Sequence, residues 1–101
     1  MKASPHFTID ELTFSETAAR KGIDNTPSDE VVDNLYITAW SMENVRELLG
    51  NNPILISSGY RSLELNTLLG SKPTSAHTRG LACDFTCPKY GDPHDIVDAI
   101  F

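Results

Sequence analysis

The chain has 101 residues, enough for one small domain and too few for two, so residues 1–101 are treated as a single domain. Hydrophobic residues make up 40% of it and charged residues 22%, as in ordinary globular proteins. The formal net charge of -6 argues against nucleic acid as a partner, because a phosphate backbone selects a basic surface. No apolar run reaches the roughly 18 residues that a membrane span needs, and the N-terminus shows no apolar core of a secretory signal.

The first half of the chain predicts three helices. Thr8 followed by Glu11 has the spacing of a capping box, so a short helix is expected to begin near Ile9. A second helix is expected from residue 15 to residue 21, followed by a turn over residues 24–27.

The third predicted helix is the longest one, which Ser28 caps and Gly50 ends. Its apolar residues recur at steps of three and four, which predicts one buried stripe: Val31, Leu35, Ala39, Met42, Val45 and Leu49. Tyr36 and Trp40 flank the stripe and are expected in the core or at its boundary.

The second half predicts two strands and two helices. Residues 54–57 begin with three consecutive apolar residues and predict a strand buried on both faces, and residues 81–86 predict a second strand. A helix capped by Ser62 is expected over residues 63–69, and a last one after Asp92. Two strands are few for a stable sheet, and the last helix stops at Phe101 with its apolar face unfinished, so further chain is expected after it.

The two cysteines, Cys83 and Cys87, are four positions apart. We interpret them as half-buried free thiols, with a short-loop disulfide as the alternative. A cysteine zinc site is disfavoured, because structural zinc sites use CxxC-like pairs and this spacing is CxxxC.

Three residues are candidates for chemistry. His77 lies in a polar loop and Asp84 in the middle of an apolar strand, where a carboxylate is costly unless it is paired or bound to a metal. Taken alone, such a pair is more often structural than metal-binding. Arg61 follows the first strand and could hold a substrate carboxylate or carbonyl, or simply form an ion pair.

Two motifs in order change this weighting. The sequence Ser-Gly-Tyr-Arg-Ser at residues 58–62 and the pattern Ser-x-His-x-x-Gly-x-Ala-x-Asp at residues 75–84 together resemble the zinc D-alanyl-D-alanine carboxypeptidases and related phage endolysins. The N-terminal stretches at residues 7–12, 18–20 and 22–27 resemble the same family, so the likeness runs from about residue 7 to about residue 100.

The resemblance implies an α+β fold, Hedgehog-like, with helices packed on a small antiparallel sheet that here lacks its C-terminal strands. It implies that His77 and Asp84 are ligands of a catalytic Zn²⁺, and that Ser75 lies beside the metal or contacts substrate. Arg61 is implied to hold substrate or to stabilise the oxyanion. The family's third zinc ligand, a histidine, and its acidic catalytic base come from later strands and are not in this sequence.

The resemblance further implies that the substrate is the stem peptide of peptidoglycan, without saying which bond is cut. We expect the chain alone to hydrolyse it poorly. Without a visible signal, we expect cytoplasmic synthesis followed by phage-type release or incorporation into a virion. The alternative function is a non-catalytic wall-binding or phage structural module that keeps the fold. A second chain that supplies the missing strands is a third possibility; it requires an oligomer, for which the sequence offers no evidence. His6 is expected at the surface, and His94 in the first turn of the last helix.

Overall fold

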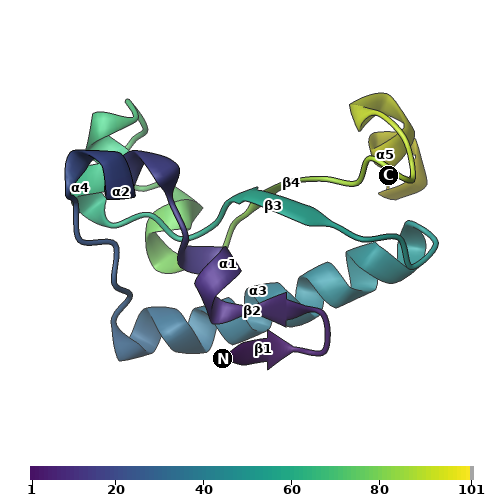
Figure 1. Ribbon diagram of the computed structural model, residues 1–101, viewed down its shortest axis with the longest axis horizontal. Coiled ribbons are helices and arrows are strands. Elements are labelled where there is room, and N and C mark those ends of the chain that lie inside the picture. The colour runs from purple at the N-terminus through teal and green to yellow at the C-terminus, as the bar shows by residue number, and fades with distance from the viewer. Residues whose placement is uncertain (101) are drawn as a thin grey trace.

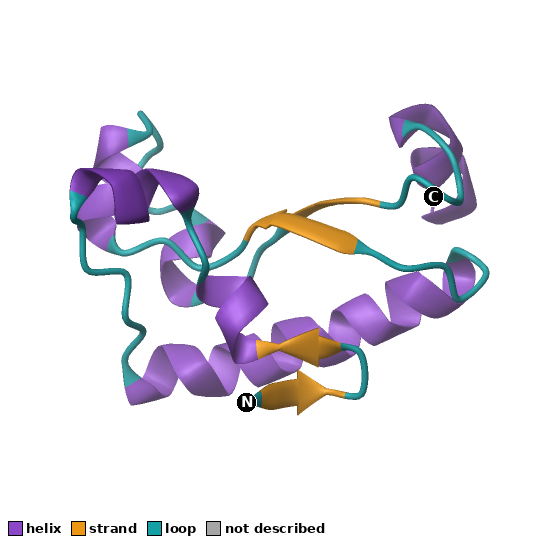
Figure 2. Ribbon diagram, in the orientation of Figure 1, coloured by secondary structure: helices purple, strands orange, loops and turns teal. Residues whose placement is uncertain are grey.

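The computed structural model describes residues 1–100 and confirms an α+β fold with small antiparallel sheets (Figures 1 and 2). The elements in chain order are β1 (Lys2–Ser4), β2 (Phe7–Thr8), α1 (Ile9–Thr13), α2 (Glu16–Lys21), α3 (Asp29–Leu48), β3 (Leu55–Ser58), α4 (Leu63–Leu68), the 3-10 helix η1 (Ala76–Arg79), β4 (Asp84–Thr86) and α5 (Pro93–Ile100). None of the helices in this range is long and apolar enough to cross a membrane.

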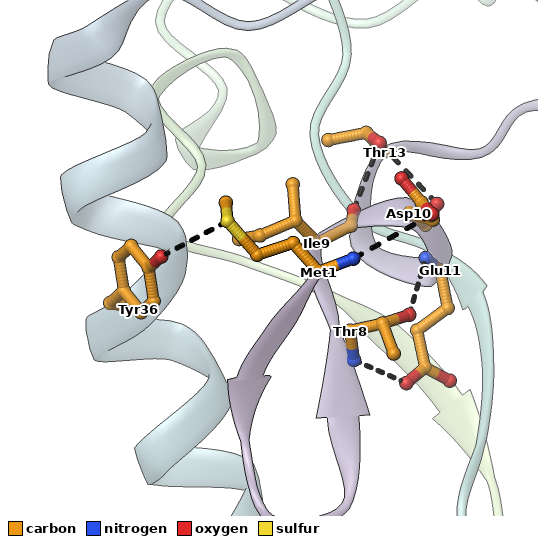
Figure 3. A network of polar contacts seen from close by, with 7 residues as sticks. All are labelled: Met1, Thr8, Ile9, Asp10, Glu11, Thr13 and Tyr36. Carbon is orange, nitrogen blue, oxygen red and sulfur yellow. Dashed lines mark hydrogen bonds and ion pairs between the residues drawn. The ribbon is translucent and has the colours of Figure 1, made fainter.

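The N-terminal hairpin of β1 and β2 was not predicted, because strands of three and two residues leave no readable alternation. It leads directly into α1, whose capping box is confirmed (Figure 3). The Thr8 hydroxyl accepts from the Glu11 backbone N–H at 3.1 Å, and the Glu11 carboxylate accepts from the Thr8 N–H at 2.7 Å. These two bonds satisfy N–H groups that the first turn leaves free, so they fix the start of the helix.

Helix α3 forms the base of the molecule, and α1 lies between it and β3 (Figure 1). The predicted stripe is confirmed: Leu35, Ala39, Met42 and Leu49 are buried, and Val31 and Val45 are partly buried against them. The prediction for Trp40 was wrong, since 56% of this residue is exposed. Position 40 therefore lies outside the buried stripe of α3.

The pair β3 and β4 corrects two predictions. The first strand is not buried on both faces: Leu55 and Ser57 are exposed, because the sheet has only two strands and is covered on one side. The second strand is shorter than residues 81–86, because the ladder has a register shift after Ile56 and ends with Ser58 opposite Asp84. Over the paired residues of β4, Asp84 and Thr86 are exposed and the residue between them is partly buried.

The C-terminal helix α5 packs against α3. Asp92 caps it as predicted, with its carboxylate accepting from the Asp95 N–H at 3.0 Å. Both cysteines are free thiols: Cys87 is fully buried rather than half-buried, and Cys83 is partly buried. Burial, with a smaller contribution from the neighbouring Asp84 charge, raises the pKa of Cys83 to about 11, so this thiol stays protonated and unreactive at neutral pH.

Candidate metal and substrate site

His77 lies on η1, not in an irregular loop, and its ring is fixed by one strong hydrogen bond. Its Nδ1 is 2.7 Å from the carbonyl oxygen of Gly59. A carbonyl can only accept, so Nδ1 carries the proton and Nε2 of the neutral ring is left with its lone pair. Histidine ligands of metals in proteins are commonly held in this way. The side chain of His77 is only 14% exposed, so the ring is largely shielded from solvent.

Asp84 is the first residue of β4 rather than a mid-strand residue, and its side chain is 61% exposed. The expectation of a costly buried carboxylate was therefore wrong. Asp84 is distinguished by two contacts of one carboxylate oxygen: its Oδ2 is 3.7 Å from Nε2 of His77 and 3.6 Å from Nη2 of Arg61. The two motifs, distant in sequence, meet at this single oxygen.

Arg61 is 14% exposed and held at several points. Its Nε donates to the hydroxyl of Ser58 and its Nη1 to that of Ser71, both at 3.2 Å, while Nη2 faces Asp84. Its backbone N–H donates to the carbonyl of His77 at 3.0 Å. Arg61 is thus an ion-pair partner that lies within the candidate site, and its contact with substrate stays a prediction.

The donors present fit a zinc ion in type and spacing. Zinc binds imidazole nitrogen and carboxylate oxygen at about 2.0–2.2 Å in tetrahedral geometry, so two such ligand atoms are roughly 3.3 Å apart. The separation between the Nε2 of His77 and the Oδ2 of Asp84, 3.7 Å, needs only a small adjustment. Within residues 1–100 no group of three His, Cys, Asp or Glu side chains is placed to hold a metal. The described residues thus offer two candidate ligands, His77 and Asp84.

Ser75 has a role that the sequence did not specify. It caps η1, and its hydroxyl accepts from the His77 N–H at 3.3 Å, while its carbonyl accepts from the Thr78 hydroxyl at 2.6 Å. The serine therefore holds the backbone turn that carries the histidine. Its implied contact with metal or substrate stays a prediction.

The other histidines lie elsewhere, as expected. His94 is exposed in the first turn of α5, and His6 is at the surface. His6 also pairs with Glu43, whose carboxylate is 2.7 Å from the Nδ1 of His6 and accepts from the Ser4 hydroxyl at 2.6 Å. Burial by itself would raise the pKa of Glu43. The hydrogen bonds from Ser4 and His6 outweigh burial and hold this pKa below its usual value.

The sequence did not reveal the residues that support Arg61 and His77 through hydrogen bonds: Ser58, Gly59, Ser71 and, above all, Asn25. Ser58 and Gly59 were within the matched motif but had no assigned part, and the loop with Ser71 gave no signal. Asn25 was interpreted as part of a turn and of a stretch that resembles the family, but it had no assigned part. Its contacts become visible only when segments distant in sequence are placed together.

Comparisons with known proteins identify the family of the chain. The zinc D-Ala-D-Ala carboxypeptidase of Streptomyces albus G is 31% identical to the chain over 58 residues, which are 57% of this chain and 23% of that protein. The match thus spans less than a quarter of that relative's length. No solved structure matches the chain significantly. The sequence model of the peptidase M15 family matches residues 5–99, which include both motifs and the elements that position them. Since that match covers nearly the whole chain, the chain belongs to the peptidase M15 family.

Proposed function

We propose that this chain supplies His77 and Asp84 as ligands, and Arg61 as substrate-holding group, to a zinc peptidase that hydrolyses stem peptides of peptidoglycan. The observation that carries the proposal is the meeting of the Nε2 of His77 and the Oδ2 of Asp84 at 3.7 Å, with the opposite ring nitrogen already bound to Gly59. The carboxypeptidase relative, which is named for zinc and for D-Ala-D-Ala, supports both the metal and the substrate class.

Each residue has a defined part in this proposal. His77 enters as a neutral ligand, because its proton is on Nδ1 and is used by the Gly59 carbonyl. A zinc ion held there would polarise a scissile carbonyl and lower the pKa of water. Arg61 is charged at any physiological pH and has its guanidinium next to Asp84, so it is placed to hold a carboxylate or a developing oxyanion beside the metal.

Metal binding tests the site directly. We expect the metal-free chain to bind one equivalent of Zn²⁺ in calorimetric titration, with His77→Ala or Asp84→Asn abolishing this binding. His94→Ala is the matched control, since it removes an exposed histidine outside the site. Zinc binding that survives both site substitutions, or that is lost with His94→Ala alone, would refute the assignment.

A hydrolysis assay tests whether catalysis needs groups that residues 1–101 do not supply. Because the third ligand and the base that the resemblance implies are not within residues 1–101, we expect no chelator-sensitive cleavage of a stem pentapeptide by this chain alone. Such cleavage would contradict the proposal that further groups are needed. Zinc binding without hydrolysis by a longer form that carries those groups would favour the non-catalytic wall-binding module.

A further inference from the structure

The side chain of Asn25 is bonded to the peptide groups on both sides of Arg61. Its Nδ2 donates to the carbonyl of Tyr60 at 3.0 Å, and its Oδ1 accepts from the N–H of Ser62 at 2.7 Å. The second Nδ2 hydrogen goes to the carbonyl of Thr13 at 2.8 Å. All donors of this carboxamide are used, and each bond reaches a segment outside the turn that contains Asn25.

The turn itself does not require Asn25. Its local hydrogen bond is made by the preceding residue, whose carboxylate accepts from the Thr26 N–H at 2.9 Å and whose pKa is lowered by the hydroxyl and N–H of Thr26. Asp24 thus performs the role expected of a turn residue, and Asn25 is left for long-range contacts.

The two peptide groups that Asn25 binds are those that set the direction of the Arg61 side chain. The Arg61 N–H is already held by the carbonyl of His77 at 3.0 Å, and the Tyr60 N–H by the carbonyl of Leu12 at 2.7 Å. With the Tyr60 carbonyl and the Ser62 N–H also bound, each backbone N–H from residue 60 to residue 62 has a fixed partner.

We propose that Asn25 is the positioning residue of Arg61. It acts through the backbone and touches neither metal nor substrate. The inference rests on the proposed function only in that Arg61 serves the site. Displacements of the order of 1 Å in a group that holds substrate can lower a rate by about 100-fold. A carboxamide is needed, because the position must offer one acceptor and two donors at once. Aspartate would keep the acceptor but would face two carbonyl oxygens without a proton.

Nitrogen-15 NMR of the metal-free chain tests this without any activity. In the wild-type protein the Arg61 Nε–H donates to Ser58 and is shielded, so it should exchange slowly with water. We expect Asn25→Ala to speed its exchange by about tenfold or more, since three hydrogen bonds are lost. The Leu35 amide in the core of α3 should change much less. The matched control is Asp24→Ala, which opens the same turn and should leave Arg61 unchanged.

The outcomes separate positioning from a general loss of structure. Equal acceleration at Arg61 and Leu35, or an Arg61 signal that Asn25→Ala does not alter, would overturn the proposal. If Asn25→Ala does not fold, Asn25→Asp decides. This variant keeps the bond to Ser62 and should give an Arg61 exchange rate that is faster than wild type; a wild-type rate would overturn the proposal.

Zinc titration of the same samples keeps the two proposals apart. Failure of the wild-type chain to bind zinc would refute the proposed metal site and leave the Arg61 exchange result standing. Conversely, zinc binding with no response of Arg61 to Asn25→Ala would refute the positioning role alone. If both proposals hold, a longer active form should lose kcat with Asn25→Ala while its zinc affinity changes little.

Discussion

Replacing Gly59 by alanine tests how the site is supported. The residue connects β3 to Arg61, and its backbone lies directly against the C-terminal part of α1. A Cβ atom at this position would overlap the carbonyl oxygen of Leu12 and lie 2.8 Å from the carbonyl carbon. That oxygen also accepts from the Tyr60 N–H at 2.7 Å, so α1 cannot retreat without stretching this bond.

The size of the destabilisation by Gly59→Ala follows from the atoms that the added methyl group would contact. Added methyl groups in a packed interior cost about 1–3 kcal/mol when flexible side chains can yield. Here the neighbour is backbone, and a short hydrogen bond is strained as well, so we expect Gly59→Ala to cost about 3 kcal/mol or more. For a domain of this size that lowers the melting temperature by about 12 °C or more.

Thermal unfolding followed by circular dichroism measures this, with Gly70→Ala as the control. Gly70 has a φ of +77°, and a Cβ atom added there would meet no other atom within 4 Å, so alanine costs only the left-handed backbone strain of about 1–2 kcal/mol. Gly59→Ala should also weaken zinc binding, because the Gly59 carbonyl orients His77. If Gly59→Ala is no more destabilising than Gly70→Ala, the close contact with α1 is not rigid and the reasoning fails.

Two further predictions concern the frame around the site. Hydrogen bonds from Ser4 and His6 lower the pKa of folded Glu43, so its contribution to stability is complete above the unfolded pKa of about 4.3 and is lost as the pH falls through the lower folded pKa. Urea titrations between pH 3 and 7 should therefore show a smaller loss of unfolding free energy at low pH for Glu43→Gln than for the wild-type protein. Equal losses would contradict this. Thr38→Val leaves the Gly80 carbonyl, now bonded at 2.6 Å, without its buried donor and should cost about 1–3 kcal/mol in urea unfolding, whereas a cost near zero would show that another donor replaces it.

The parts of the fold that depend on local chemistry could be predicted from sequence. The helices after Thr8, Ser28, Ser62 and Asp92 all begin where those caps indicated, because a cap acts within one turn.

The burial of β3 could not be predicted in this way. Its apolar run would suit a strand covered on both faces, but burial depends on which other elements cover the sheet. That is a property of the whole arrangement, and Leu55 is exposed as a result.

For the candidate site, too, some features could be predicted from the sequence and others could not. His77, Asp84 and Arg61 could be named because they belong to motifs that resemble a known family. Their mutual distances and the exposure of Asp84 could not, and the burial argument for Asp84 was wrong. The contacts of Asn25 could not be predicted either, because each of its partners is far away along the chain.

The hydrogen bonds of residues 60–62 have a consequence for local unfolding of the protein. Three consecutive amides donate to three different parts of the chain: to Leu12 in α1, to His77 in η1, and to Asn25 in the turn before α3. A fluctuation that loosens one of these neighbours leaves the other two bonds closed. Hydrogen exchange in this segment should therefore follow the cooperative opening of the whole domain rather than local fraying. The arginine is then held in place for as long as the domain stays folded.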